Sequence, residues 1–265
     1  MLNKKTAIIT GGSSGIGKAI ALKFAEEGAI VHIFDTQKCS EFDRNPEQVK
    51  HHECDISKTD EVKHIVDSIA KQNKIDILVN NAGISHIGNI EHTEEQDLDR
   101  LIGVNIKGVI NSSKACISHM KFQGGVILNM ASIAATVGLK DRFAYSMTKG
   151  AVIAMTYSIA KDYLDFDIRC NSISPARIHT PFVDGFLKEN YPGREKEVYE
   201  KLAQSQPIGR MGTPEEVVKV KESHTATYLK PLLGKSKIKV EAKDAKSAAK
   251  KLPAKKKATK KRKAA

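Results

Sequence analysis

The sequence has 265 residues, of which 40% are hydrophobic, so it is long enough for one domain with a substantial buried core. No apolar run reaches the ~18 residues that a membrane span needs, and the run 7–9 is too short for a signal-peptide core, so we expect a cytoplasmic protein without membrane contact. The net charge of +12 arises near the C-terminus, because residues 219–265 hold 17 Lys or Arg and 3 Asp or Glu. Residues 1–218 hold 26 basic and 28 acidic residues. The overall basicity is therefore no argument that residues 1–218 bind nucleic acid.

Apolar, β-branched runs alternate with helical patterns through residues 1–218. The expected strands are 6–10, 30–35, 49–53, 75–80, 126–130 and 168–173, and the expected helices are about 16–27, 60–72, 95–121 and 143–164. This alternation is typical of a doubly wound parallel sheet, so we predict a single α/β, Rossmann-like domain. Residues 219–265 are too rich in lysine to bury a core and are expected to form a largely disordered basic tail.

A glycine-rich turn follows the first expected strand. Residues 10–17 read Thr-Gly-Gly-Ser-Ser-Gly-Ile-Gly and lead directly into a helix. Glycines permit a tight turn and let a pyrophosphate approach the N–H groups of a helix N-terminus. A plain turn is the alternative, but the position between a strand and a helix favours dinucleotide binding.

Asp35 ends the second expected strand. A carboxylate there can accept hydrogen bonds from the adenosine ribose and would repel a 2′-phosphate, which favours NAD over NADP. No basic residue lies within 11–17 to bind such a phosphate. The alternative is that Asp35 only caps a turn.

Tyr145 and Lys149 lie four residues apart in an expected helix and so share one face. A neighbouring ammonium lowers the pKa of a tyrosine and makes it a better acid–base group. Tyr157 and Lys161 repeat this spacing about 18 Å further along the helix. Because ligands bind at the carboxyl ends of strands, where the next helix begins, we assign catalysis to the first pair and a structural role to the second.

Ser132 and Asn105 are weaker candidates when each is taken alone. Ser132 follows the fifth expected strand, where its hydroxyl could hold a substrate oxygen beside Tyr145. Asn105 lies within an apolar helical stretch, and a water relay to Lys149 would satisfy its buried amide. As isolated residues they would more often be a loop serine and a satisfied polar group. The four cysteines form no Cys-x-x-Cys pair, so we expect reduced thiols and no metal site.

Together these features resemble the short-chain dehydrogenase/reductase family of the single-domain type. The matching stretches are 10–17, 54–56, 80–83, Asn105, Ser132, the Tyr-Ser-Met-Thr-Lys run 145–149 and the run 169–175. The resemblance implies an NAD-dependent oxidoreductase that acts on a CH–OH group of a small-molecule substrate. Tyr145 would be the acid–base, Lys149 would bind the nicotinamide ribose, Ser132 would orient the substrate and Asn105 would hold a relay water.

The resemblance also implies which residues bind the cofactor. Those at the phosphates would be Gly11, Ser14, Ile16 and Gly17. Those on the adenosine side would be Asp35, Asp55, Ile56, Asn81 and Gly83. Those beside the nicotinamide would be Tyr145, Lys149, Pro175, Ile178 and Thr180.

The C-terminus departs from the family pattern. The family has a further helix and a final strand carrying Val-Asp-Gly-Gly at the place of residues 219–265. Without that strand, 168–173 is expected to be an edge strand. The self-association that the resemblance implies is therefore in doubt for this chain. The tail could bind nucleic acid through phosphates, since seven of the nine residues 255–263 are Lys or Arg, or it could have no function. A cofactor-binding but inactive or unstable variant, or a nucleic-acid-associated protein, is therefore the alternative function.

The substrate lid is expected at about 176–207. The resemblance extends to family members that act on sugars, sugar acids, 3-hydroxy acids and acyl-carrier-protein esters. Arg142 or Arg194 could meet a substrate carboxylate, although an arginine of this kind is more often an exposed surface residue. The sequence leaves the substrate open within these classes.

Overall fold

The computed structural model describes residues 2–44 and 47–219. These residues belong to one compact unit. From residue 220 onward, the basic tail expected from the sequence lies outside the described residues. The expectation that this segment replaces the family's final helix and strand falls on the same residues.

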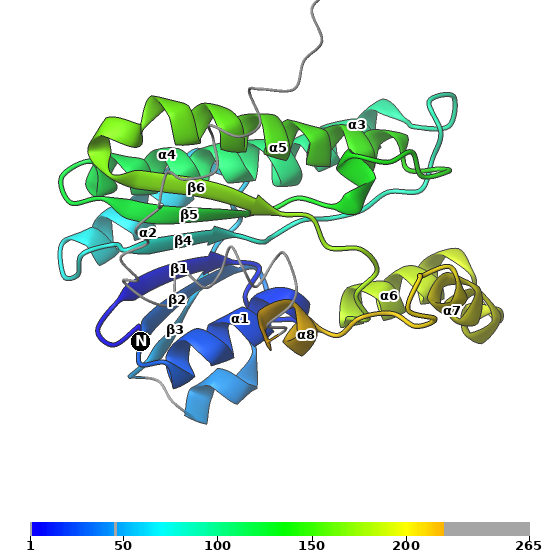
Figure 1. The fold of residues 1–265 in the computed structure, drawn as a ribbon, viewed down its shortest axis with the longest axis horizontal. Helices are drawn as coiled ribbons and strands as arrows, with labels where there is room; N and C mark the ends of the chain where they lie inside the picture. The colour runs from blue at the N-terminus through cyan, green and yellow to red at the C-terminus, as the bar shows by residue number, and fades with distance from the viewer. Residues whose placement is uncertain (1, 45–46, 220–265) are drawn as a thin grey trace, which may run out of the picture. The chain divides into compact units, whose positions relative to one another are not determined.

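Six parallel strands form the sheet, in the order β3-β2-β1-β4-β5-β6 (Figure 1). Their bounds are β1 Thr6–Thr10, β2 Ile30–Asp35, β3 Val49–Glu53, β4 Ile77–Asn80, β5 Gly125–Met130 and β6 Ile168–Ile173. The predicted doubly wound parallel sheet is confirmed, and β6 is an edge among the described strands. The order reverses between β1 and β4, and a crevice for a ligand is expected where their carboxyl ends diverge.

Helices cover both faces of the sheet, and a separate hydrophobic core lies on each. One core packs α1 (Gly15–Glu26) against the sheet through residues such as Ile20 and Phe24. The other packs α2 (Thr59–Ala70), α4 (Gly108–Met120) and α5 (Phe143–Asp162) against the opposite face. All five residues of β1 are buried, which is why this strand reads as a continuous apolar run rather than an alternating one.

The single helix expected over 95–121 is wrong. The structure has α3 (Glu95–Leu101), then a π-helical turn over Ile102–Lys107, and then α4. Asn105 lies in that turn and is fully buried. Single π-turns inside helices often occur at functional sites, and here the turn carries a candidate site residue.

The expected lid region forms two helices, α6 (Pro181–Asn190) and α7 (Glu195–Gln204), between two ends that are paired with each other. Ile178 forms a β-bridge with Gly212, and the N–H of Gly212 donates to the carbonyl of Arg177 at 2.9 Å. A short helix, α8 (Pro214–Lys219), follows and contacts α1. The lid therefore leaves and rejoins the body at one place.

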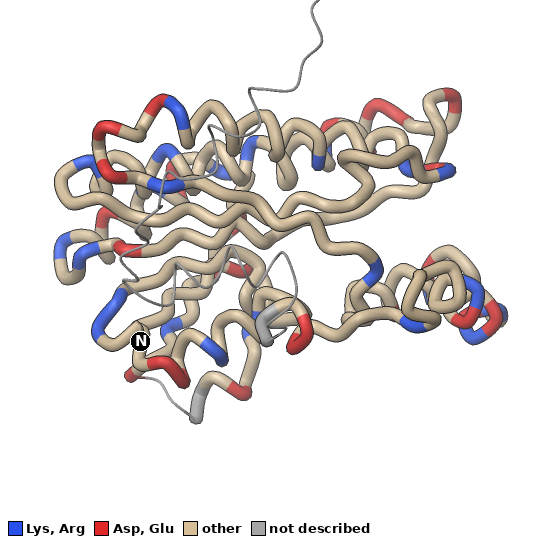
Figure 2. Tube along the Cα trace, viewed as in Figure 1, with Lys and Arg blue, Asp and Glu red and all other residues tan. Residues whose placement is uncertain are grey.

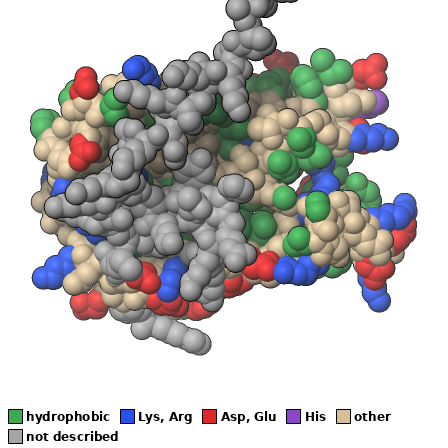
Figure 3. All heavy atoms as spheres, viewed as in Figure 1, with side chains coloured by type: hydrophobic (Ala, Val, Ile, Leu, Met, Phe, Trp, Pro, Cys, Tyr) green, Lys and Arg blue, Asp and Glu red, His purple; other side chains and the backbone are tan. Residues whose placement is uncertain are grey.

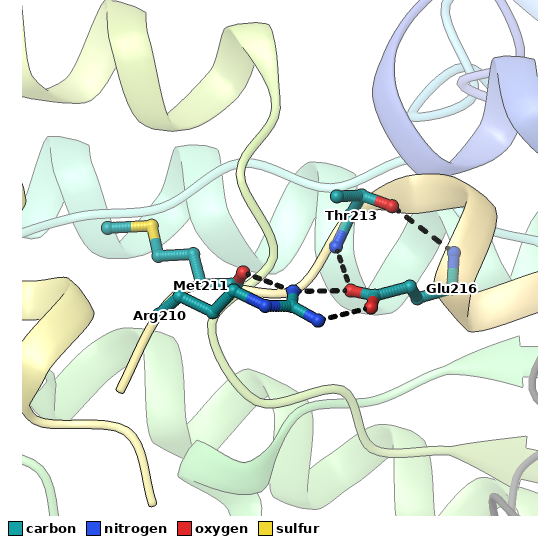
Figure 4. Close-up of polar contacts among 4 residues, drawn as sticks. All are labelled: Arg210, Met211, Thr213 and Glu216. Carbon is teal, nitrogen blue, oxygen red and sulfur yellow. Dashed lines mark hydrogen bonds and ion pairs between the residues drawn. The ribbon is translucent and has the colours of Figure 1, made fainter. Parts of the chain in front are cut away.

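Glu216 fastens the far end of the lid to α8 (Figure 4). Its carboxylate accepts two hydrogen bonds from the Arg210 guanidinium, at 2.9 and 2.6 Å, and one from the N–H of Thr213 at 2.9 Å. The Thr213 hydroxyl accepts a hydrogen bond from the N–H of Glu216 at 3.3 Å, which completes a capping box at the start of α8. These contacts hold the pKa of Glu216 at about 2.

Acidic and basic residues are interspersed along the helices and loops around the sheet (Figure 2). In that view neither sign is collected on one side of the described chain. This pattern agrees with the near balance of acidic and basic residues before residue 219.

Candidate active site

A cleft of about 830 Å³ lies where the carboxyl ends of the strands meet the loops that follow them and the lid helices. All the predicted site residues line this cleft except Asn105 and Gly17, which lie behind its wall. Figure 3 shows a hollow beside the α6–α7 segment, with hydrophobic side chains at its border. One cleft thus brings together residues that are separated by more than 160 positions in the chain.

The glycine turn is built by close backbone packing. Gly11 has a φ of +65°, and a Cβ there would lie 2.7 Å from the Cα of Ala82. A Cβ at Gly17 would collide with the carbonyl oxygen of Gly11 and with Nδ2 of Asn81. Gly17 is therefore required by the packing of α1 under the turn, and it shapes the cleft without lining it.

Asn81 links the ends of β1 and β4 at the switch point. Its Nδ2 donates to the carbonyl of Thr10 at 3.1 Å and to that of Gly11 at 2.9 Å. Its own N–H donates to the Thr10 hydroxyl at 3.0 Å. The side chain thus fixes the glycine turn against β4, and the residue also borders the cleft.

Asp35 caps the turn that follows β2. Its carboxylate accepts hydrogen bonds from the N–H groups of Ser13 and Gln37, each at 3.0 Å. The residue also lines the cleft. The cationic residues that line the cleft are Arg142, Lys149 and Arg177, which come from α5 and from the loop after β6, on the other side of the switch point.

Asp55 and Ile56 follow β3 and line the same side of the cleft as Asp35. Oδ1 of Asp55 accepts hydrogen bonds from the N–H and hydroxyl of Ser57, at 3.0 and 2.7 Å. Ile56 packs against Gly108 at the start of α4, where no Cβ could be accommodated. Two local contacts therefore fix this loop without any part of the cofactor.

Tyr145 lies in the first turn of α5 and faces Ser132, which follows β5. The two hydroxyls share a hydrogen bond, and Oγ of Ser132 also accepts one from the N–H of Ala134 at 3.2 Å. Burial raises the pKa of Tyr145 above its ordinary value, whereas the Ser132 hydrogen bond and the charge of Arg142 oppose the rise. The net direction is opposite to the one expected from a neighbouring lysine, because burial is the largest effect.

Lys149 is buried and its Nζ donates a hydrogen bond to the carbonyl of Met130 at 2.8 Å. The same Nζ lies 6.0 Å from the centre of the Tyr145 ring. Burial lowers the pKa of Lys149 to about 8. A Cβ at Gly83 would lie 3.2 Å from this Nζ and 3.2 Å from Oδ1 of Asn105, so the glycine leaves space beside both groups.

The side-chain amide of Asn105 has partners within the protein. Its Oδ1 accepts a hydrogen bond from the N–H of Ile84 at 2.8 Å, and its Nδ2 donates to the Ile84 carbonyl at 2.9 Å and to the Thr148 hydroxyl at 3.0 Å. Because Thr148 precedes Lys149, the amide holds α5 and the chain after β4 in place. The structure thus shows a positioning contact at this residue.

The second Tyr-x-x-x-Lys pair lies outside the cleft. Tyr157 is 71% exposed, and Lys161 is exposed as well. Neither residue lines the cleft. They are surface residues rather than the structural pair that was expected, and geometry alone separates them from Tyr145 and Lys149.

Arg177 is a cleft residue that the sequence interpretation missed. It lines the cleft with Arg142, whereas Arg194 is exposed and pairs with Glu197 on α7. Its position in the sequence could have indicated this role, because Arg177 follows β6 and Pro175, at the same edge of the sheet as the other candidate residues. Of the two arginines considered from the sequence, only Arg142 lines the cleft.

A family model described as enoyl-(acyl carrier protein) reductase matches residues 11–221. The chain belongs to the short-chain dehydrogenase/reductase family. It is 36% identical to 3-oxoacyl-(acyl-carrier-protein) reductase FabG of Thermotoga maritima, over 83% of this chain and 89% of that protein. Members of the short-chain dehydrogenase/reductase family are oxidoreductases that act on CH–OH and keto groups, and this chain is one of them.

Two solved structures of this family are similar to the chain. The ligand-free aldohexose dehydrogenase of Thermoplasma acidophilum matches with a TM-score of 0.76 and 34% identity, over 88% of each chain. The 3-ketoacyl-(acyl-carrier-protein) reductase of Brucella melitensis, solved in complex with NADH, matches with a TM-score of 0.74 and 33% identity, over 86% of this chain and 91% of that one. The Rossmann-like fold predicted from the sequence is thereby confirmed.

Within residues 2–44 and 47–219, no helix is long and apolar enough to cross a membrane. In the same part of the chain, no group of three or more His, Cys, Asp or Glu is placed to hold a metal ion.

Proposed function

We propose that the protein is a cytoplasmic, NAD-dependent oxidoreductase that interconverts a secondary alcohol and a ketone. The observation that carries the proposal is the meeting of Tyr145, Ser132 and Lys149 in one cleft with the glycine turn over 11–17. When bound, the nicotinamide would supply the acceptor or donor of the hydride. The protein's own contribution is to bind, orient and exchange a proton.

The proton exchange belongs to Tyr145. In ketone reduction its hydroxyl gives a proton to the carbonyl oxygen, and in alcohol oxidation its phenolate takes the proton back. Ser132, which already shares a hydrogen bond with Tyr145, holds the same substrate oxygen. Because burial raises the pKa of Tyr145, the phenol is the resting form at neutral pH, so oxidation gains rate as the pH rises.

Lys149 supports this group in two ways. Among the described residues, the ammonium of Lys149 donates one hydrogen bond, to Met130, so two of its three N–H donors remain for the ribose hydroxyls beside the nicotinamide. Its positive charge, when present, favours the phenolate of Tyr145. The opening at Gly83 leaves Nζ accessible from the cleft.

The rest of the cleft fits a dinucleotide. Gly11, Ser14 and Ile16 line it at the N-terminus of α1, where N–H groups favour phosphates. Pro175, Ile178 and Thr180 line it beyond β6, beside the expected nicotinamide position. Asp35 contributes a carboxylate where a 2′-phosphate would need a cation, which favours NAD over NADP.

Fluorescence titration with NADH and NADPH tests the cofactor, and a screen of sugars, hydroxy acids and steroids with NAD tests the reaction. We expect tighter binding of NADH than of NADPH and formation of NADH with at least one substrate class. A chain that binds neither nucleotide would contradict the proposal. A chain that binds NADH and turns over none of these classes would support the inactive variant instead.

A further inference from the structure

Two arginines line the lid side of the cleft. Arg142 immediately precedes α5, and its guanidinium lies 4.8 Å from the centre of the Phe186 ring on α6. Its Nη1 donates to the carbonyl of Asp141 at 3.2 Å. Arg177 comes from the loop after β6, where its backbone is paired with Gly212. Both guanidiniums are half-buried, and Tyr191 lies near both.

No carboxylate neutralises this pair within the described part of the chain. Neither arginine forms an ion pair there, whereas Arg194 and Arg210 are paired with glutamates. The acidic residues that line the cleft are Asp35 and Asp55, which follow β2 and β3 at the other side of the sheet order. Asp141 has the smallest effect on the pKa of Arg142 among the groups that shift it.

Leaving the two charges together costs free energy. Burial lowers the pKa of each guanidinium, and the charge of Arg177 lowers that of Arg142 further. An arginine stays charged under these conditions, so the repulsion cannot be relieved by losing a proton. An anion bound between the two groups would relieve it and would accept hydrogen bonds in the fork geometry that guanidinium offers to carboxylates.

Resting on the function proposed above, we propose that Arg142 and Arg177 bind a carboxylate of the substrate, which is therefore a hydroxy acid or an oxo acid. Arg142 immediately precedes α5 and Tyr145 lies in the first turn of that helix, so both side chains enter the cleft from the same end of α5. A substrate held at both groups has its carboxylate within a few bonds of the carbinol carbon. The chemistry is thus that of a short acid whose reacting oxygen faces Tyr145 and Ser132.

Apolar side chains in the rest of the cleft wall, which also carries Ser85 and Gln206, favour an aliphatic chain over a polyhydroxylated one. Val137 and Leu139 line the cleft after β5, and Leu202 and Met211 line it from the lid and its far end. A sugar would bury several hydroxyls against these apolar side chains without partners, which is costly. Among the classes that the sequence left open, the cleft therefore favours hydroxy acids with apolar chains.

Matched pairs of an acid and its primary amide test the proposal. The wild-type protein is assayed with NAD and 2- or 3-hydroxypentanoate, and with the corresponding amides. Binding of unreactive pentanoate and pentanamide is measured by calorimetry, with and without NADH. We expect kcat/KM to favour at least one acid over its amide by about 10- to 100-fold, as a hydrogen-bonded charge predicts, and pentanoate to bind more tightly than pentanamide.

Three variants assign the effect to residues. Arg142→Gln and Arg177→Gln should each remove most of the preference for the acid while leaving the Kd for NADH unchanged. Arg194→Gln, which removes an arginine outside the cleft, should leave the preference intact. Failure to bind NADH would overturn the proposed function itself. Normal NADH binding with equal use of acid and amide, or an acid preference that survives both cleft variants, would overturn the arginine assignment alone.

Discussion

Nζ of Lys149 and the main-chain carbonyl of Met130 are joined by a buried hydrogen bond of 2.8 Å. The bond connects the second turn of α5 to the last residue of β5. Because Tyr145 is one turn before Lys149 and Ser132 is two residues after Met130, the same contact sets the two hydroxyls opposite each other. Tyr145, the proposed acid–base group, is therefore positioned by a lysine that also belongs to the expected cofactor site.

Replacing Tyr145 with Phe should lower kcat by about 10²- to 10⁴-fold, because the variant keeps the ring and loses the proton-exchanging hydroxyl. The Kd for NADH should change little. Tyr157→Phe is the matched control, since it makes the same change on the same helix outside the cleft, and its kinetics should equal those of the wild type. Steady-state assays and fluorescence titration measure both quantities. Equal losses in the two variants would show that the assignment is wrong.

Replacing Asp35 with Asn should narrow the preference for NADH over NADPH. Asn keeps an acceptor oxygen for the N–H groups of Ser13 and Gln37 but removes the charge that repels a 2′-phosphate. The ratio of the two dissociation constants is the measurement, because a general loss of structure would weaken both nucleotides alike. A ratio identical to that of the wild type would remove Asp35 from the ribose site.

Two Gly→Ala changes in helices should have opposite effects on stability. At Gly17 the new methyl would collide with Gly11 and Asn81, so the free energy of unfolding should fall by about 1–3 kcal/mol and NADH binding should weaken. At Gly150, in α5, nothing lies within 4 Å of the added Cβ, and the change should stabilise the protein by about 0.5–1 kcal/mol. Urea denaturation measures both. A stabilised Gly17→Ala variant would contradict the packing described for the glycine turn.

His32 should make the protein less stable in mild acid. Its Nδ1 lies 2.9 Å from Nε2 of His52 on the neighbouring strand, and its Nε2 is buried without a partner among the described residues. Burial lowers the pKa of His32 to about 4. The unfolded chain takes up this proton near pH 6.5, so the stability from the neutral ring is full above that pH and is lost as the pH falls toward 4, by at most about 3 kcal/mol.

The measurement is the free energy of unfolding as a function of pH between 7 and 4, for the wild type and for His32→Gln. The variant should show a shallower dependence over this interval, whatever its stability at pH 7. His64→Gln, which removes an exposed imidazole from α2, controls for the substitution itself. An unchanged slope in His32→Gln would mean that other groups control the acid sensitivity.

The sequence was sufficient to place a site residue where a local pattern shows at which point a strand ends or a helix begins. Asp35 could be placed because β2 ends there, and Tyr145 because α5 begins just before it. Neither inference needed a long-range contact, since parallel strands bring their carboxyl ends to one edge of the sheet.

The sequence was insufficient where a residue's role depends on distant partners. Asn105 binds Ile84 and Thr148, which lie 21 and 43 positions away, and no local pattern indicates these contacts or the π-helical turn that they accompany. The pKa of Tyr145 was misjudged for the same reason, because spacing reveals a neighbouring charge but not the degree of burial.

The common origin of Arg142, Tyr145 and Lys149 at one end of α5 has a consequence for chain length. Arg142 precedes the first turn of α5, and the backbone of Arg177 is held by its pairing with Gly212, so we expect the separation between the proposed acid anchor and the hydroxyl of Tyr145 to vary little. An acid with one more methylene between its carboxylate and carbinol would place its reacting carbon about 1 Å out of position, and a displacement of that size can cost about 100-fold in rate. The enzyme would thus select its substrate by the number of carbons between the carboxylate and the carbinol carbon.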